Sequence, residues 1–155
     1  MRQQILTMLD MQNSMNKKIH PDWIDQNYEW YRAIWIECGE LMDHFGYKWW
    51  KKQCPDLEQV KLEIIDIWHF GMSALFFQFT NNEEIADYII NSFKSVDHKK
   101  LLVRDATEEL ACWYLKNKNF SPEIFKKLMD SVELDFDTLY VSYVGKNVLN
   151  FFRQD

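Results

Sequence analysis

The sequence predicts an all-α fold, a helical bundle formed by one domain over residues 1–155. Apolar residues recur at three- and four-residue steps through most of the chain, as they do along one face of a helix. No stretch shows the sustained apolar–polar alternation of a half-buried strand. Only four residues are glycine and three are proline, while 47% are hydrophobic. We therefore expect a sizeable core and little disorder.

The expected helices follow, in chain order, from this periodicity and from residues that begin or end helices. Gly46 ends the second helix, and Asp56 and Asp105 cap the third and the fifth. Ser121, with a proline after it, begins the sixth. Whether the sixth helix stops at Ser131 or joins the last one stays open. Helices are expected over residues 3–18, from 25 or 26 to 45, 56–79, 83–93, 105–118, from 123 onward, and 136–152.

Charge and composition exclude several classes of function. The net charge is −6 and no dense stripe of Lys and Arg occurs, which argues against a nucleic acid polymer as partner. The three scattered cysteines indicate neither a disulfide framework nor a zinc site. The N-terminus lacks an apolar signal core, and the apolar run 64–79 is too short and too polar to span a membrane. We expect a cytoplasmic, soluble protein.

Two carboxylate pairs stand out, Glu37-Cys-Gly-Glu40 and Glu63-Ile-Ile-Asp66. Carboxylates three residues apart share one face of a helix, so two facing helices can present four of them to one point. The helix around Glu63 is apolar on nearly every side, and a helix of that kind is normally buried. For either pair alone, a solvated or lysine-paired arrangement is favoured.

Both pairs together favour a metal site. Buried carboxylates without a partner are costly, and four that converge repel one another unless a divalent ion lies between them. Oxygen ligands suit a hard cation, Mg²⁺ first and Mn²⁺ second.

Three further groups of polar residues are candidates for binding. The connector 47–52 is aromatic and basic and can hold an anion or stack a base, although a solvated aromatic staple is about equally favoured. The last helix carries a polar stripe suited to a phosphate and a sugar or base, whereas the stripe taken alone favours a solvated face. A pair of amides shares a face of the first helix and, taken alone, predicts surface residues. The members are Lys48, Trp49, Trp50 and Lys51; Tyr143, Lys146, Asn147, Asn150 and Arg153 or Gln154; and Gln12 and Asn16.

In this order the motifs resemble a known family, the all-α NTP pyrophosphatases, which share Glu-x-x-Glu, 22 residues, then Glu-x-x-Asp. IECGEL, Lys-Trp-Trp-Lys, EIIDIWHF and the closing Tyr-x-x-Lys-Asn-Val-Leu-Asn-x-Phe-Arg-Gln are similar to the dimeric dUTPases. The match covers most of the first 79 residues and about the last 20, whereas residues 80–130 align only by helix count. Members usually continue with a glycine-tyrosine segment, so we expect a more open site if that segment acts as its cover.

The resemblance implies a homodimer that hydrolyses dUTP, and sometimes dUDP, with dUMP and pyrophosphate as the products from dUTP. A metal-bound water attacks the α-phosphorus, and which of Glu37 and Glu40 is the general base stays open. The implied Mg²⁺ ligands are Glu37, Glu40, Glu63 and Asp66. The implied substrate contacts are Gln12 and Asn16 at the uracil edge, His69 and Phe70 at the base and deoxyribose, Trp49 or Trp50 over the nucleotide, Lys146, Asn150 and Arg153 at phosphate and sugar, and, more weakly, Lys48 and Lys51 at phosphate.

Three alternatives remain. The first is a dCTP-directed or broader house-cleaning pyrophosphatase. The second is a helical interaction module without enzymatic activity. The third, a di-iron oxidoreductase, ranks lowest. Such sites usually require a Glu-x-x-His motif on each of two helices, and the sequence contains no such motif. The abundance of aromatic and methionine residues supports the homodimer by supplying an apolar interface.

Overall fold

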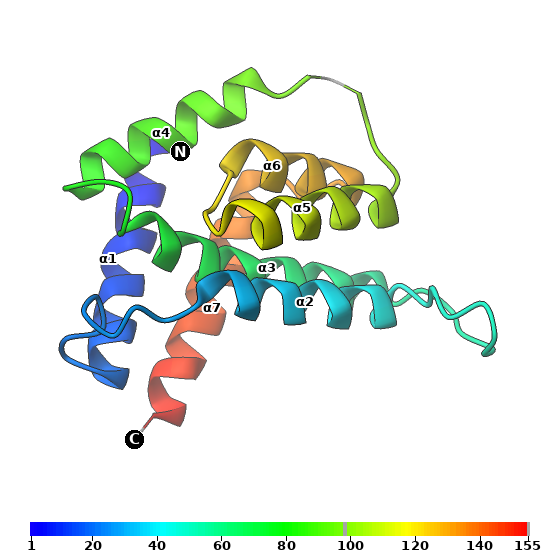
Figure 1. The fold of residues 1–155 in the computed structure, drawn as a ribbon, viewed down its shortest axis with the longest axis horizontal. Coiled ribbons are helices and arrows are strands. Elements are labelled where there is room, and N and C mark those ends of the chain that lie inside the picture. The colour runs from blue at the N-terminus through cyan, green and yellow to red at the C-terminus, as the bar shows by residue number, and fades with distance from the viewer. Residues whose placement is uncertain (98, 155) are drawn as a thin grey trace.

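The computed structural model describes residues 1–97 and 99–154, and these form seven helices and no strand, so the all-α prediction is confirmed. None of the described helices combines the length and apolar character needed to cross a membrane. The helices, labelled in Figure 1, are α1 (Arg2–Ile19), α2 (Trp30–His44), α3 (Leu57–Leu75), α4 (Asn82–Ser95), α5 (Val103–Asn117), α6 (Pro122–Ser131) and α7 (Phe136–Arg153).

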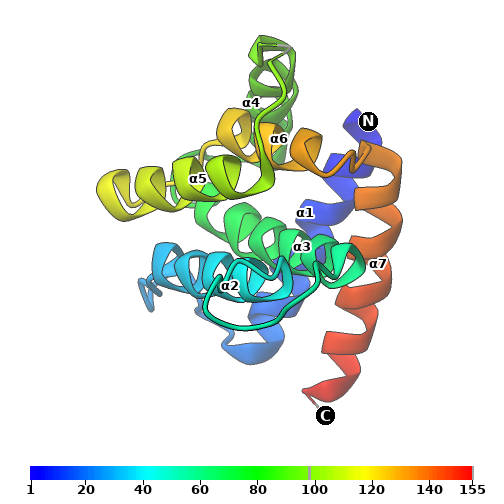
Figure 2. The ribbon, with the colours of Figure 1, turned by 90° about the vertical axis from the view of Figure 1, so that its right-hand side faces the viewer.

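Helix α3 passes through the middle of the bundle (Figures 1 and 2). Helix α2 lies beside it and runs in the opposite direction, with α5 against α2 and α6 against α5. Helices α1 and α7 pack against each other and against α3. The connector between α2 and α3 projects beyond the ends of both helices (Figure 1).

Burial on nearly every side makes α3 the centre of the core. Trp68 is fully buried and stacks on Phe125, with ring centroids 4.9 Å apart. Gly71 lets Phe120 approach the helix, since a Cβ at residue 71 would lie 2.1 Å from a ring carbon of Phe120. The all-round apolar pattern around Glu63 thus corresponds to a buried central helix, as expected.

Several helix ends agree with the sequence signals. Gly46 follows α2 with a φ of 77°, a conformation that glycine adopts without strain. The side chains of Asp56 and Ser121 accept hydrogen bonds from the first turns of α3 and α6. The open question about the sixth helix is answered as well: α6 stops at Ser131, and Glu133 takes a φ of 56° before α7 begins.

Other ends were predicted wrongly, because tertiary packing decides them. Helix α2 begins at Trp30 rather than near residue 25 or 26, and residues 21–27 form turns in which Asn27 has a φ of 52°. Trp23 anchors this segment: it is buried, and its indole nitrogen donates to Asn13 Oδ1 at 3.1 Å. The rings of Phe76 and Phe77 pack edge-on against Trp23.

Helix α3 accordingly ends at Leu75 rather than at residue 79, because Phe76 and Phe77 turn toward Trp23. Helix α5 begins at Val103 without a side-chain cap, two residues before the expected cap Asp105. Val103 is buried in the hydrophobic core, and its packing there explains why α5 begins earlier than expected.

Candidate active site

The antiparallel packing of α2 and α3 brings three carboxylates together. Glu37 comes from α2, and Glu63 and Asp66 come from α3. One oxygen of each lies within 4.8 Å of the others. Glu63 is buried, with 8% of its surface exposed, and the other two are half-buried. We call these three residues the carboxylate cluster.

Glu40, the fourth expected ligand, is exposed and does not belong to the carboxylate cluster. It is nevertheless near enough for its charge to raise the pKa of both Glu37 and Asp66. Glu40 also lines a groove of about 410 Å³ between α2 and the connector, together with Lys48 and Trp50.

Burial and mutual repulsion make the carboxylate cluster costly without a cation. Burial, the charge of Asp66 and a hydrogen bond with Glu63 raise the pKa of Glu37 to about 8. Burial also raises the pKa of Asp66, and its hydrogen bond with Lys146 acts in the opposite direction. Oxygen-only donors of this kind suit Mg²⁺ or Mn²⁺, because a divalent ion removes the repulsion. The residues present therefore fit the metal that the sequence predicts.

A lysine and a histidine contact the carboxylate cluster. Lys146 of α7 forms an ion pair with Asp66, and its Nζ lies 3.4 Å from the carbonyl oxygen of Leu62. Nε2 of His44 lies 3.2 Å from Oε1 of Glu63. His44 is not among the residues expected from the sequence, although it lies seven residues after Glu37 and so on the same face of α2.

Gln12 and Asn16 are not surface amides, as they would be if taken alone. They are only 4% and 3% exposed, because α1 presents this face to α3 and α7. Nε2 of Gln12 donates to Oδ1 of Asn16 at 3.0 Å, and Nδ2 of Asn16 donates to Oγ of Ser73 at 2.9 Å. The Tyr143 hydroxyl lies 2.9 Å from Oε1 of Gln12 and accepts from Asn147 at 3.2 Å.

His69 completes this buried polar network. Its Nδ1 lies 2.9 Å from Oε1 of Gln12, and because the Gln12 amide nitrogen already donates to Asn16, Nδ1 carries the proton. Burial lowers the pKa of His69 to about 3, so the ring is neutral. Its Nε2 has no hydrogen-bond partner among the described residues. The ring stacks on Tyr143 at 4.2 Å.

Part of this network follows from the spacing of its residues. On α3, Ser73 lies four residues after His69 in a second polar stripe, and Tyr143 and Asn147 belong to the polar stripe of α7. Their spacing predicts a shared helix face. It does not predict that the two stripes meet around Gln12.

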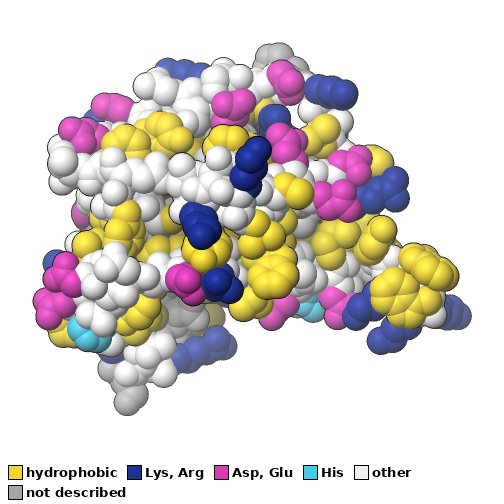
Figure 3. Space-filling model, viewed as in Figure 1, with side chains coloured by type: hydrophobic (Ala, Val, Ile, Leu, Met, Phe, Trp, Pro, Cys, Tyr) yellow, Lys and Arg dark blue, Asp and Glu magenta, His cyan; other side chains and the backbone are white. Residues whose placement is uncertain are grey.

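The remaining candidates lie nearer the surface. Phe70 is half-buried against Trp30, with ring centroids 6.1 Å apart. Trp49 and Trp50 are 84% and 64% exposed on the projecting connector. Figure 3 shows apolar and basic side chains gathered on that projection. Trp50 also lines the groove that contains Glu40.

The lysines of the connector and the end of α7 are also accessible. Lys48 pairs with Asp43 at 2.5 Å, and Lys51 is exposed. Asn150 is half-buried and Arg153 is exposed, one and nearly two turns beyond Lys146 on α7. Lys146 is therefore the residue of the polar stripe on α7 that contacts the carboxylate cluster.

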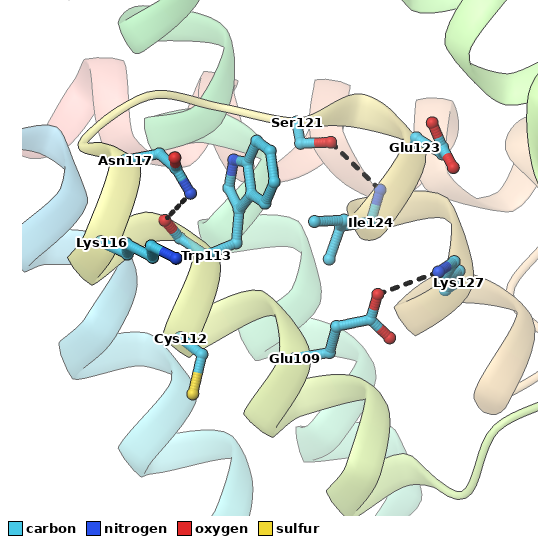
Figure 4. A pocket seen from close by; sticks show the side chains of 9 residues that line it. All are labelled: Glu109, Cys112, Trp113, Lys116, Asn117, Ser121, Glu123, Ile124 and Lys127. Atoms are coloured by element: carbon cyan, nitrogen blue, oxygen red, sulfur yellow. Dashed lines mark hydrogen bonds and ion pairs between the residues drawn. The ribbon is translucent and has the colours of Figure 1, made fainter.

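A second groove, of about 500 Å³, lies between α5 and α6 (Figure 4). Several polar groups that line this groove bind one another. Lys127 forms an ion pair with Glu109 at 2.9 Å, and Asn117 donates a hydrogen bond to the carbonyl oxygen of Trp113 at 3.0 Å. It contains no member of the carboxylate cluster.

Comparison with known proteins gives one family match. A family model described as dUTPase matches residues 4–155, almost the whole chain. A search of curated proteins found no match.

Proposed function

Since the chain belongs to the dUTPase family, we propose that its carboxylate cluster holds Mg²⁺ for the hydrolysis of dUTP to dUMP and pyrophosphate. The observation that supports the metal is the convergence of three carboxylates, one buried and two half-buried, within 4.8 Å. A bound divalent ion would neutralise charge on the phosphate oxygens and lower the pKa of water. Mn²⁺ would be accepted at the same ligands.

Glu37 and Glu40 divide the roles of ligand and general base in this proposal. Glu37 keeps its proton up to a pH of about 8 when no cation neutralises its neighbours, because its pKa is raised that far. A neighbouring divalent charge favours the carboxylate form, which can then accept a proton. Glu40 is exposed beside the carboxylate cluster and can accept a proton directly from water. Single substitutions at the two positions would distinguish their roles.

The buried polar network is the proposed base site. Gln12 and Asn16 would exchange their mutual hydrogen bond for bonds with the uracil edge, since an amide both donates and accepts. His69 lies in direct contact with Gln12. Phe70, the next residue in the sequence, would supply an apolar wall for the base. Because the two amides are buried, neighbouring side chains would have to move before the base could reach them.

The phosphates and sugar would lie along α7 and the connector. Lys146 already reaches the carboxylate cluster, and Asn150 and Arg153 continue the same side of α7. Trp49 or Trp50 would cover the nucleotide, and Trp50 already lines the groove that contains Glu40. Lys48 and Lys51 are the weaker phosphate contacts in the proposal.

The homodimer, the cytoplasmic location, the single domain and the lack of a nucleic acid polymer as partner stay predictions. Exposed apolar side chains along α7, three of which share one face at positions seven and four residues apart, support a dimer contact on that helix. They are Val141, Val148, Leu149 and Phe152.

The test measures release of pyrophosphate and phosphate from dUTP, dCTP, dTTP and UTP, with Mg²⁺ and with EDTA. We expect pyrophosphate from dUTP with Mg²⁺, and strong loss of turnover in EDTA and in Glu63→Gln. Glu58→Gln is the matched control, since Glu58 lies on α3 and its side chain is 85% exposed. Cleavage of all four nucleotides would indicate a house-cleaning pyrophosphatase, and no turnover with any of them would contradict the proposal.

A further inference from the structure

The ammonium group of Lys146 lies where a cation is needed. It forms an ion pair with Asp66 across the contact between α7 and α3 and also lies 3.4 Å from the carbonyl oxygen of Leu62. The side chains of Lys146 and Asp66 are only 25% and 22% exposed, so water screens their attraction less than it would at an open surface.

The same carboxylate is a member of the carboxylate cluster, so the ammonium and a divalent ion would share one ligand. Lys146 contacts Oδ2 of Asp66, and one oxygen of Asp66 lies within 4.8 Å of those of Glu37 and Glu63. A divalent ion held there would repel an ammonium this close. The two cations therefore compete for Asp66.

We propose that Lys146 is a resident counter-cation of the metal-free enzyme, which leaves Asp66 when the divalent ion binds and then becomes available to the substrate phosphates. This inference rests on the proposed function, because it takes the carboxylate cluster to be the metal site. It assigns Lys146 two successive partners, first a carboxylate and then a phosphate, both of which an ammonium binds through charge-assisted hydrogen bonds.

The exchange makes metal and nucleotide binding depend on each other. An ammonium that stays on Asp66 disfavours the metal, and one that has left is free to attract the anionic phosphates. Each ligand therefore favours the state that the other one needs, and by linkage the effect is reciprocal. A lysine that only bound phosphate would affect nucleotide affinity and leave the metal affinity of the free enzyme unchanged.

The first experiment measures the Kd of Mn²⁺ without nucleotide, by electron paramagnetic resonance, for the full chain and its Lys146→Met variant. We expect the variant to bind Mn²⁺ about tenfold more tightly, as loss of a close competing charge predicts. Its KM for dUTP should change in the opposite direction and rise. Lys146→Arg keeps the charge and should stay near the parent. Unchanged or weaker Mn²⁺ binding in Lys146→Met would overturn the inference.

Lys61→Met is the matched control, since Lys61 carries the same charge on α3 but pairs with Glu58 at 3.7 Å. Its Kd for Mn²⁺ should stay within about twofold of the parent, because surface charges are largely screened. An equal gain in both lysine variants would mean that general charge, and not the contact with Asp66, governs the affinity, and would overturn the inference.

A second readout follows the ammonium directly. The rate at which acetic anhydride modifies Lys146, measured by mass spectrometry, should rise when Mg²⁺ is added. Lys94, exposed in the last turn of α4, reports any general change in reactivity. Equal rates at Lys146 with and without Mg²⁺ would show that the ammonium does not leave Asp66.

The results distinguish the proposed metal site from the proposed exchange of Lys146. If the parent binds no Mn²⁺ and Glu63→Gln makes no difference, the metal site and the inference both fall. If the parent binds Mn²⁺, Glu63→Gln abolishes the binding and Lys146→Met leaves it unchanged, the proposed function stands and the inference alone is wrong.

Discussion

Replacement of Glu63 by Gln should affect the metal-free and metal-bound protein in opposite directions. Glu63 is 8% exposed and its oxygen lies within 4.8 Å of those of Glu37 and Asp66. Glutamine keeps the size of the side chain and removes its charge. We expect the metal-free fold to become more stable, because a repelling charge is lost, and Mg²⁺ to stabilise it no longer, because a ligand is lost.

The size of the effect depends on pH. Two charges 4.8 Å apart repel by about 3.5 kcal/mol at an effective dielectric constant of about 20. Glu37, with a pKa of about 8, is protonated at pH 6 and ionised at pH 9, so the repulsion is larger at pH 9. After allowance for solvent near the half-buried partners, we expect a gain of about 1–2 kcal/mol at pH 9 and little at pH 6. That gain corresponds to roughly 2–8 °C in Tm for a domain of this size.

The assay is thermal unfolding of the parent, Glu63→Gln and the control Glu58→Gln, at pH 6 and pH 9, in EDTA and in Mg²⁺. In the parent, Mg²⁺ at about 100 times its Kd should contribute about 2.7 kcal/mol. In Glu63→Gln this contribution should vanish, while Glu58→Gln should behave like the parent. A Glu63→Gln protein that is less stable in EDTA at pH 9, yet still stabilised by Mg²⁺, would refute the reasoning.

Three further predictions concern other parts of the molecule. The metal-free protein should lose stability between about pH 5 and pH 8, because Glu37 holds a proton in the fold that the unfolded chain releases near its ordinary pKa of 4.5; urea midpoints in EDTA check this, and a rise in stability would contradict it. Gln12→Ala should raise KM for dUTP at least about tenfold and leave the Kd of Mn²⁺ unchanged, since it removes a partner of the base and not of the metal. Gly71→Ala should cost about 1–3 kcal/mol through its clash with Phe120, and Phe120→Leu should recover part of that loss; an additive double variant would show that the clash is absent.

Local sequence patterns predicted the helices because the apolar period and the caps are short-range features. Asp56 and Ser121 cap helices through residues three positions on, and the sequence displays that spacing directly. The ends that were predicted wrongly depend on distant contacts. Phe76 and Phe77 pack against Trp23, and this contact shortens α3. No local sequence pattern predicts a contact between residues so far apart.

The same distinction applies to the candidate site. The spacing of Glu63 and Asp66 predicts one helix face, and a facing helix with Glu37 completes the carboxylate cluster. The partner of Asp66 is Lys146, 80 residues later, and its identity depends on how α7 crosses α3. Sequence spacing gives the face of each helix and leaves open which faces meet.

The buried amides of α1 depend on tertiary packing in the same way. Gln12 and Asn16 share a face of α1 by their spacing, but only tertiary packing determines that this face is buried. The hydroxyl of Tyr143 reaches Gln12 from 131 residues away. A pair of polar side chains with one spacing is compatible with a solvated surface and with a buried network, and the packing of α7 against α1 decides between them.

Hydrolysis of dUTP in H₂¹⁸O with Mg²⁺ tests most directly whether the carboxylate cluster serves attack of water on the α-phosphorus. Mass spectrometry of the products should find ¹⁸O in dUMP and none in pyrophosphate, at a rate that EDTA and Glu63→Gln reduce strongly. Label in pyrophosphate, release of dUDP with phosphate, or equal turnover in EDTA would contradict that chemistry at this site.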